Sequence, residues 1–428
     1  MSKFQIILLA VFAVAIVASV AVFSLYRGSS GSSVALTVWG DIPSNDFSLL
    51  LNTPTFSGDS TLSVSYVEKS IETIETEFTE ALARGTGPDL IIITQDNLWS
   101  NKPKLAVIPY ASVSEQSFKA AFVDEGELFF DQSGIYALPL SLDPLVLYYN
   151  KDTLAATGQS QPLKYWDEIY AAATNFSKMD PAGNLVSSVM ALGEAHNISH
   201  AKDILSLLML QAGTPITGIV NQELRSQIAD NFQLIVSPGE AALNFFTQFS
   251  NPAKSFYSWN RSLTDARTHF TSGDSAYYLG FASELKVLKN MNPNLNFGVS
   301  SVPQSRVSSK IITFGRLRGV AISRSSKNLT TAFTFAAKLA SKDSALSLSE
   351  IMYLPSARRD LLSLKPSGDA TLSVFYDSAI QSRGWLDPDS SVTDVIFREA
   401  IESITSGRAR TTGALNKANS EINALIKQ

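Results

Sequence analysis

The sequence predicts an α/β fold of two doubly wound lobes behind an N-terminal transmembrane helix. Three observations lead to this prediction. The chain begins with a long apolar stretch, the region after it alternates short apolar strands with helices, and its 428 residues exceed what one compact core holds. Domains usually contain about 100 to 200 residues, so two lobes are the first expectation. Alternating strands and helices imply a parallel sheet covered by helices.

The N-terminus predicts a membrane anchor. Residues 4–26 are apolar except for one glutamine and two serines. The apolar core of a signal peptide has about 7 to 15 residues and a spanning helix needs about 20, so the length favours an uncleaved anchor. The small residues 18–21 leave a cleaved signal peptide as the alternative. Lys3 and the amino terminus favour an N-terminus inside the cell. Residues 28–33 (GSSGSS) then form a tether of roughly 15 Å, which keeps the body outside the cell and near the membrane.

Three strands are expected to start the first lobe. Residues 34–39 and 61–67 are short strands, and residues 89–94 (DLIIIT) are apolar enough to be buried on both faces. Residues 71–82 carry apolar side chains at helical spacing, and Gly85 and Gly87 stop this helix. A sheet of this kind binds ligands beyond the carboxyl ends of its strands.

The middle of the chain predicts a second lobe. Its pattern indicates an extended segment at residues 134–150, helices at 166–176, 204–211, 242–249 and 263–270, and a strand at 276–279. After it we expect a short strand at residues 320–323 and helices at 332–340 and 415–425.

The composition excludes several classes of function. The net charge is -5, so nothing favours binding to the phosphates of nucleic acids. The chain has no Cys, which removes disulfides, thiol catalysis and lipid attachment through a cysteine. It also lacks the Walker, GxGxxG, GxSxG and HExxH motifs of nucleotide-binding proteins and hydrolases.

Two short patterns resemble metal sites, but neither predicts one. His196 and His200 are four residues apart without an evident third ligand, and a polar loop at a helix start explains them better. Residues 387–394 resemble the opening of a calcium loop but lack its glycine and its final glutamate. We therefore expect no metal and no other cofactor.

Several segments together resemble the family 1 extracellular solute-binding proteins of ABC importers, the group that includes maltose-binding protein. They occur in the family's order across nearly the whole exported region. The segments are 83–92 (ARGTGPDLII), 134–150 (GIYALPLSLDPLVLYYN), 162–169 (PLKYWDEI), 270–280 (FTSGDSAYYLG), 318–328 (RGVAISRSSKN) and 406–422 (SGRARTTGALNKANSEI).

The resemblance implies a periplasmic-binding-protein fold of type II, in which the chain crosses three times between two lobes. The family's members close on a solute in the cleft and dock on a permease, so no catalytic residue is needed. The crossings are expected near residues 140–143, 311–314 and 353–355. The expected units are the anchor and tether (1–33), the N-lobe (34–140 plus 315–352) and the C-lobe (141–314 plus 353–428).

The expected ligand is a small polar solute, and a sugar suits the residues that the resemblance marks. Sugars need polar partners for their hydroxyls and aromatic rings for their apolar faces. The resemblance carries ligand carboxylates onto Asp96 and Asp143, and less cleanly onto Asp41. At the family's aromatic position after the third strand this chain has Ile93, which puts maltose itself in doubt. Trp99, six residues further on, is the candidate that replaces it. The other candidate aromatic residues are Trp39, Phe281 and Trp385, for which a packing role is the slightly better explanation.

Two other functions remain open from the sequence. A tethered sensor that presents its ligand to a signalling receptor would have the same fold. An extracellular glycan-acting enzyme would use Asp96 and Asp143 as paired carboxylates. The fold alone does not choose the ligand, because the same architecture serves many solutes.

Overall fold

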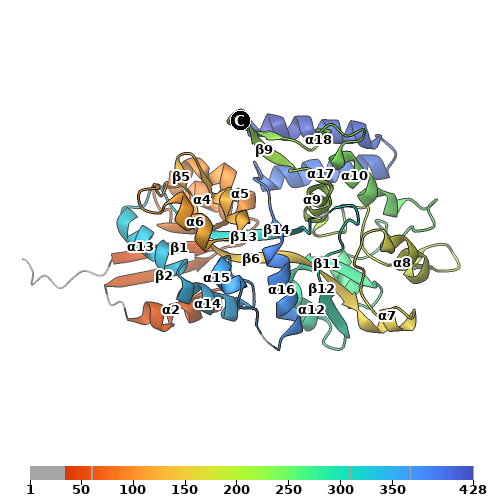
Figure 1. Cartoon of the computed structure of the whole chain (residues 1–428), viewed down its shortest axis with the longest axis horizontal. Coiled ribbons are helices and arrows are strands. Elements are labelled where there is room, and N and C mark those ends of the chain that lie inside the picture. Colours follow the sequence, from red (N-terminus) through yellow and green to blue (C-terminus); the bar gives the residue numbers. More distant parts are fainter. Residues whose placement is uncertain (1–33, 59–60, 309, 367, 428) are drawn as a thin grey trace, which may run out of the picture.

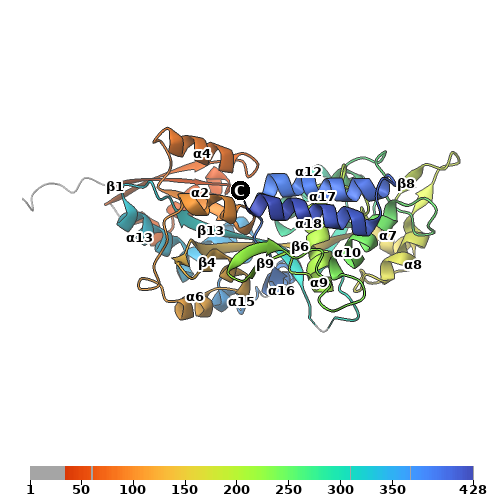
Figure 2. The ribbon, with the colours of Figure 1, turned by 90° about the horizontal axis from the view of Figure 1, so that it is seen from above.

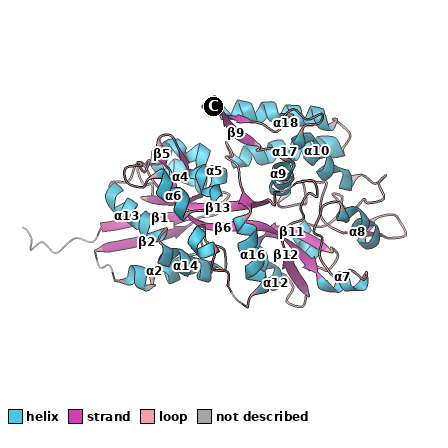
Figure 3. Ribbon diagram, viewed as in Figure 1, coloured by secondary structure: helices cyan, strands magenta, loops and turns pink. Residues whose placement is uncertain are grey.

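The computed structural model describes residues 34–58, 61–308, 310–366 and 368–427. In this part of the chain, one mixed sheet with the order β11-β6-β13-β3-β1-β2 runs through the molecule (Figure 1). Helices cover the sheet, as Figure 3 shows by secondary structure. The expected α/β class is confirmed. The predicted anchor and tether, residues 1–33, lie outside the described residues.

The first half of the molecule follows the predicted order of strands and helices. The strands β1, β2 and β3 pair in parallel, with β1 in the centre. The elements are β1 (Val34–Gly40), α2 (Ser44–Leu51), α3 (Pro54–Ser57), β2 (Leu62–Glu68), α4 (Ile74–Ala83), β3 (Leu90–Thr94), α5 (Gln95–Asn101), α6 (Glu115–Ala121), β4 (Phe130–Asp131) and β5 (Gly134–Ile135).

The chain from β6 onwards contains most of the helices. Of these, α13 and α14 return to the side of β1 and β2 (Figure 1), whereas α17 and α18 lie side by side at the other end of the molecule (Figure 2). The elements are β6 (Ala137–Asn150), α7 (Lys151–Ala156), α8 (Glu168–Phe176), β7 (Lys178–Met179), β8 (Leu185–Ser187), α9 (Ala201–Ala212), β9 (Thr217–Val220), β10 (Glu223–Ser226), α10 (Pro238–Thr247), α11 (Ala266–Thr271), β11 (Tyr277–Phe281), α12 (Leu285–Met291), β12 (Phe297–Ser300), β13 (Thr313–Ile322), α13 (Leu329–Leu339), α14 (Lys342–Met352), α15 (Arg359–Leu362), α16 (Ala370–Ile380), β14 (Ser382–Arg383), α17 (Ser390–Thr405) and α18 (Thr411–Ile426).

Two details differ from the expectation. The short strand expected at residues 320–323 is only the end of β13, because Arg316 and Arg318 interrupt the apolar pattern of a strand that continues through them. The side of the molecule that holds β11 and β12 is not doubly wound with parallel strands, since both of these strands pair with β6 antiparallel. A parallel pair would need a crossover connection, whereas these strands return in the direction opposite to β6.

Buried apolar side chains form two clusters, one in each half. The first contains Phe78 and Phe118, and we call the half around it the N-lobe. The second contains Phe246 and Trp259, and we call the half around it the C-lobe. Full burial of one such side chain stabilises the folded protein by about 1.5–3 kcal/mol. Each lobe therefore has a core of its own.

Two long strands connect the lobes. β6 pairs with β13 on the N-lobe side and with β11 on the C-lobe side. Residues 140–143 lie inside β6, and residues 311–314 run into the start of β13. Residues 353–355 follow α14 and run beside β6, where Leu142 N donates to Pro355 O at 2.9 Å. Residues in the middle of β6 and β13 consequently lie between the two lobes.

α9 ends at Gly213, whose φ of 99° is the left-handed conformation that glycine adopts readily. No helix among the described residues is long and apolar enough to span a bilayer.

Candidate functional site

Arg318 lies on β13 between the lobes and joins carboxylates that the sequence marks as candidates. Its Nε donates to Asp41 Oδ2 at 2.8 Å, and its Nη1 lies 3.8 Å from Asp143 Oδ2. Asp143 Oδ1 accepts a hydrogen bond of 2.9 Å from the backbone N–H of Ser283, a residue of the C-lobe. This chain of contacts runs from the loop after β1 to the short 3-10 helix Ala282–Glu284 after β11.

Arg316 is two residues away on the same face of β13 and makes a second bridge. Its Nη2 donates to Asp203 Oδ2 at 2.8 Å, and its Nε lies 3.8 Å from Asp96 Oδ2. The guanidinium carbon stands 4.1 Å from the ring centre of Phe281. Since Asp96 belongs to α5 of the N-lobe and Asp203 to α9 of the C-lobe, one cation holds acids of both lobes.

His200 continues this arrangement into the C-lobe. Its Nε2 lies 2.7 Å from Glu284 Oε1, and its Nδ1 lies 3.6 Å from Asp203 Oδ2. Burial favours the neutral imidazole, but Asp203 and Glu284 outweigh it and raise the pKa of His200 to about 9. Burial also opposes ionisation of Asp203 and Glu284, yet their cationic neighbours lower both pKa values to about 2.

Lys202 completes the cluster from the other side. Its Nζ donates to Asp387 Oδ2 at 3.0 Å and to Ser390 Oγ at 2.9 Å, at the start of α17. Burial raises the pKa of Asp96 to about 7, against the opposing effect of Lys202 and Arg316. We call Asp96, His200, Lys202, Asp203, Glu284, Arg316 and Asp387 the interlobe charge cluster.

Two cavities are lined by residues of the hairpin β9–β10 of the C-lobe and by Trp99 of α5 in the N-lobe, two elements that approach each other (Figure 1). One has a volume of about 880 Å³ and the other about 410 Å³. Trp99 and Gln222 line both of them. Leu386 lines the smaller cavity, while its neighbours Trp385 and Asp387 are buried behind it. We call the two cavities together the interlobe cleft.

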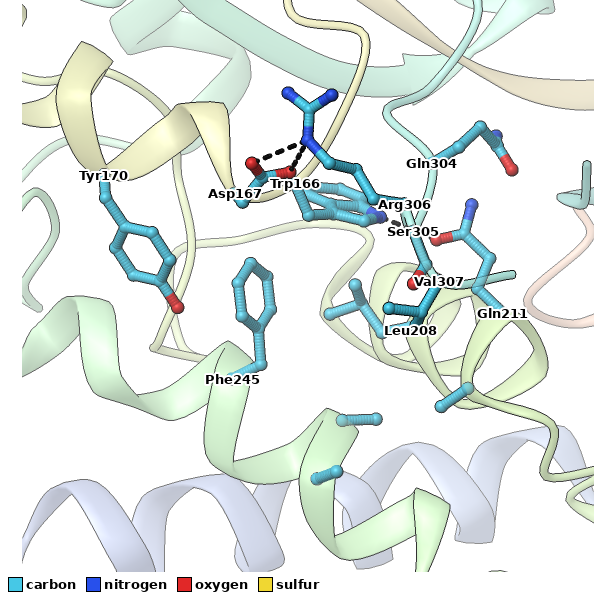
Figure 4. Close-up of a pocket in the computed structure, with 13 residues that line it drawn as sticks. Trp166, Asp167, Tyr170, Leu208, Gln211, Phe245, Gln304, Ser305, Arg306 and Val307 are labelled. Carbon is cyan, nitrogen blue, oxygen red and sulfur yellow. Dashed lines mark hydrogen bonds and ion pairs between the residues drawn. The ribbon is translucent and has the colours of Figure 1, made fainter. Parts of the chain in front are cut away.

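A separate cavity of about 500 Å³ lies within the C-lobe (Figure 4). Figure 4 shows Trp166, Tyr170 and Phe245 along it, with Arg306 paired to Asp167 at its rim. Only C-lobe residues line it. A ligand bound there would touch one lobe and could not drive closure of the other onto it.

A comparison with protein families decides the class of the protein. The model described as "Bacterial extracellular solute-binding protein" matches residues 55–368, well over half of the chain. The protein belongs to this family of extracellular solute-binding proteins. The resemblance read from the sequence is thereby confirmed, and the protein is a binding protein rather than an enzyme.

Solved structures show the same fold for this solute-binding protein. One is an ABC transporter solute-binding protein from Thermotoga lettingae TMO bound with α-D-tagatose, with 18% identity, a TM-score of 0.70, and coverage of 92% of this chain and 100% of that chain. Another is a cyclo/maltodextrin-binding protein complexed with maltotetraose, with 18% identity, a TM-score of 0.74, and coverage of 94% and 99%. A search of curated proteins gives no significant match.

The structure brings most of the predicted residues to the region between the lobes. Asp41 and Asp143 meet at Arg318, and Asp96 and Phe281 meet at Arg316. Trp385 is 2% exposed, and its Nε1 donates to Ser206 Oγ at 3.2 Å.

The other two predicted aromatic residues lie apart from the charge cluster. Trp99 lines the interlobe cleft. Trp39 instead lies under the Lys69 ammonium, which is 4.3 Å from its ring centre. The ligand-binding role of all seven residues stays a prediction.

The sequence did not indicate most of the interlobe charge cluster. Arg316 and Arg318 could have been found from their spacing of two, which places both side chains on one face of a strand. The pattern of His196 and His200 suggests a polar loop at a helix start rather than a metal pair, and neither interpretation indicates the ion pairs of His200. Among the described residues, no three acidic or histidine side chains form a group that could hold a metal ion.

Proposed function

We propose that this solute-binding protein is tethered to the membrane, closes on a small polar ligand in the interlobe cleft, and delivers it to an ABC importer. The ligand is a sugar or oligosaccharide. Closure occurs between the N-lobe (34–140 plus 315–352) and the C-lobe (141–314 plus 353–428). The permease subunits of the importer are the protein partner.

The observation that carries the proposal is that groups of both lobes line one cleft. Trp99 and Tyr136 belong to the N-lobe, and Ile219 and Gln222 belong to the hairpin of the C-lobe. A ligand shifts an equilibrium only by the difference in its affinity for the two states. A solute that touches both walls of this cleft therefore favours the closed state.

The lining of the cleft supports a sugar. Aromatic and apolar side chains lie beside carboxylate and amide groups, which is the mixture that a sugar's apolar faces and hydroxyls require. The two similar solved structures contain tagatose and maltotetraose, which agrees with this ligand class.

The apolar stretch at residues 4–26 supports single-pass anchoring, with the body on the extracytoplasmic side. The tether of residues 28–33 then keeps the cleft close to the membrane in which a permease lies.

A thermal-shift screen of mono- and oligosaccharides tests the proposal. A ligand that binds only the folded state raises the melting temperature. At a concentration of 100 times its Kd, it stabilises the folded state by about 2.7 kcal/mol. X-ray scattering with and without each hit should show a smaller radius of gyration in the complex. A panel that leaves both the melting temperature and the scattering unchanged would contradict a sugar-binding role.

A further inference from the structure

The segment between β10 and α10 begins and ends at one point of the C-lobe. Ile228, near its start, is fully buried. At its end, Gly239 in the first turn of α10 approaches Ile228 so closely that an added Cβ would stand 2.0 Å from the Ile228 carbonyl oxygen. Ser237 Oγ accepts a hydrogen bond of 3.0 Å from the backbone N–H of Glu240 and caps this helix. The segment is therefore a compact surface loop whose two ends meet.

This loop exposes a run of apolar side chains. Residues 231–236 (NFQLIV) are all exposed, and we call them the apolar loop. Phe232, Leu234, Ile235 and Val236 are 42%, 55%, 104% and 51% exposed. In the part of the chain that the structure describes, no other five consecutive residues expose more than two large apolar side chains. Single exposed apolar side chains are ordinary on a protein surface, whereas a contiguous group of them indicates contact with a partner or a membrane.

The apolar loop contains no charged side chain. Residues 231–239 include no Asp, Glu, Lys or Arg. The two charged residues before the loop, Arg225 and Asp230, form an ion pair with each other. Within the loop, the backbone N–H of Leu234 donates to Asn231 O at 2.8 Å. Because unpaired charges and polar groups are what oppose transfer from water to apolar surroundings, this loop can make that transfer at low cost.

The proposed anchor keeps the loop close to a membrane. Only seven residues join the apolar stretch 4–26 to Val34, the first residue of β1. A coil of this length spans roughly 15 Å, so the body stays near the bilayer. β1 begins at one end of the molecule in the N-lobe, whereas α10, which follows the apolar loop, lies in the C-lobe (Figure 1). A contact through the apolar loop would therefore attach the second lobe as well.

A bilayer suits the size of the apolar loop better than a protein partner does. A stable protein interface buries about 800 Å² on each side and involves roughly 20 to 30 residues. A membrane contact needs only a few apolar side chains here, because the tether makes it an intramolecular event at high effective concentration. The backbone of the loop still requires hydrogen-bond partners. The loop can consequently enter the interface, about 5–10 Å deep, but not the hydrocarbon core.

We propose that the apolar loop inserts its side chains into the lipid interface of the membrane that carries the anchor, as a second attachment of the body. The inference rests on the proposed anchoring and adds an interaction surface in the C-lobe. Its partner is the boundary between the headgroups and the acyl chains of a phospholipid bilayer. Since the loop is neutral and the chain has a net charge of -5, the contact depends on apolar burial and not on anionic headgroups. With one attachment in each lobe, the long axis of the molecule lies along the bilayer.

Fluorescence quenching of the full chain in reconstituted vesicles tests this. The protein has no Cys, so Ile235→Cys carries a single fluorescent label in the loop. Val307→Cys is the matched control, because Val307 is an apolar C-lobe side chain that is 97% exposed but lies outside the loop. The vesicles are phosphatidylcholine with a nitroxide on the upper acyl chain. We expect about threefold more quenching at position 235 than at position 307, since a shallow insertion brings the label to the depth of the nitroxide. Added phosphatidylglycerol or high salt should leave this ratio unchanged.

A charge in the loop provides a second test. Gln233→Cys places the label beside Ile235. Adding Ile235→Asp should reduce its quenching about threefold, because the change removes an apolar side chain and adds a charge that must lose its hydration. Adding Val307→Asp should leave the quenching unchanged. Both positions are almost fully exposed, so neither change should alter the melting temperature.

The outcomes separate the lipid contact from the anchor. Equal quenching at positions 235 and 307, in vesicles with which the protein floats, overturns the lipid contact and leaves the anchor intact. A label at position 235 that lipid nitroxides do not quench, but that native membranes shield from iodide, assigns the loop to a protein partner and also overturns the lipid contact. Failure of the full chain to float with the vesicles overturns both.

Discussion

His200 should retain its proton over a pH range in which a free histidine loses it, so its replacement should change how stability depends on pH. Asp203 and Glu284 raise its pKa from about 6.5 to about 9. A folded-state pKa above the unfolded value means that the stabilisation is fully present below pH 6.5 and is lost as the pH rises to 9. At ~1.36 kcal/mol per pKa unit, this loss amounts to about 3 kcal/mol.

The variant His200→Gln keeps a side chain that can donate a hydrogen bond to Glu284 but carries no titrating group. Urea unfolding between pH 6.5 and 9 should therefore show a shallower loss of stability for His200→Gln than for the wild type. The exposed residue His196 provides the control, and His196→Gln should follow the wild-type curve. Because the chain has only three histidines, nuclear magnetic resonance can also follow each imidazole directly. Parallel curves for His200→Gln and the wild type, or a His200 signal that titrates below pH 7, would refute the reasoning.

Three further changes test other parts of the structure. Burial raises the pKa of Glu125 to about 8, so wild-type stability should fall between pH 4.5 and 8 and Glu125→Gln should remove roughly 1.4 kcal/mol per pH unit of that fall in urea titrations. Arg316→Met leaves Asp203 and Asp96 without their shared cation, and chemical unfolding should show a loss of about 3–5 kcal/mol, whereas an unchanged midpoint would contradict the bridge. Phe246→Ala empties a fully buried position of the C-lobe core and should cost about 3–5 kcal/mol, while the exposed Leu364→Ala should cost less than about 0.5 kcal/mol.

The sequence predicts the N-lobe well because its signals are local. The apolar run of β3 and the glycines that follow α4 depend on neighbouring residues only, and both elements form where the pattern predicts them. In the C-lobe, the helix expected at residues 204–211 is found within α9, which ends at the local stop signal Gly213. In contrast, the β9–β10 hairpin has Asn-Gln at its turn instead of Asn-Gly, so the usual turn signal is absent.

The interlobe charge cluster could not be predicted because its members are far apart in the chain. Asp96, Asp203 and Glu284 come from separate elements, and only the two crossing strands bring them near Arg316 or His200. The acidic segment at residues 387–394 has a different role from the calcium loop it resembles. Its Asp387 accepts from Lys202, and its Asp389 caps the start of α17. The Lys202 ammonium thus takes the position beside Asp387 that a bound calcium ion would occupy.

The same cluster also bears on the charge of the ligand. Its cations Arg316, His200 and Lys202 are each already paired with a carboxylate. A charged solute entering this region would have to lose its own hydration and compete for groups that are already paired, and breaking a buried pair costs about 3–5 kcal/mol. A solute confined to the two cavities leaves every pair intact whatever its charge, because no residue of the cluster lines them. The pairs at Arg316 join Asp96 of one lobe to Asp203 of the other, so leaving them intact also keeps this contact between the lobes. The three cations of the cluster therefore offer no unpaired positive charge that would attract an anionic solute into this region.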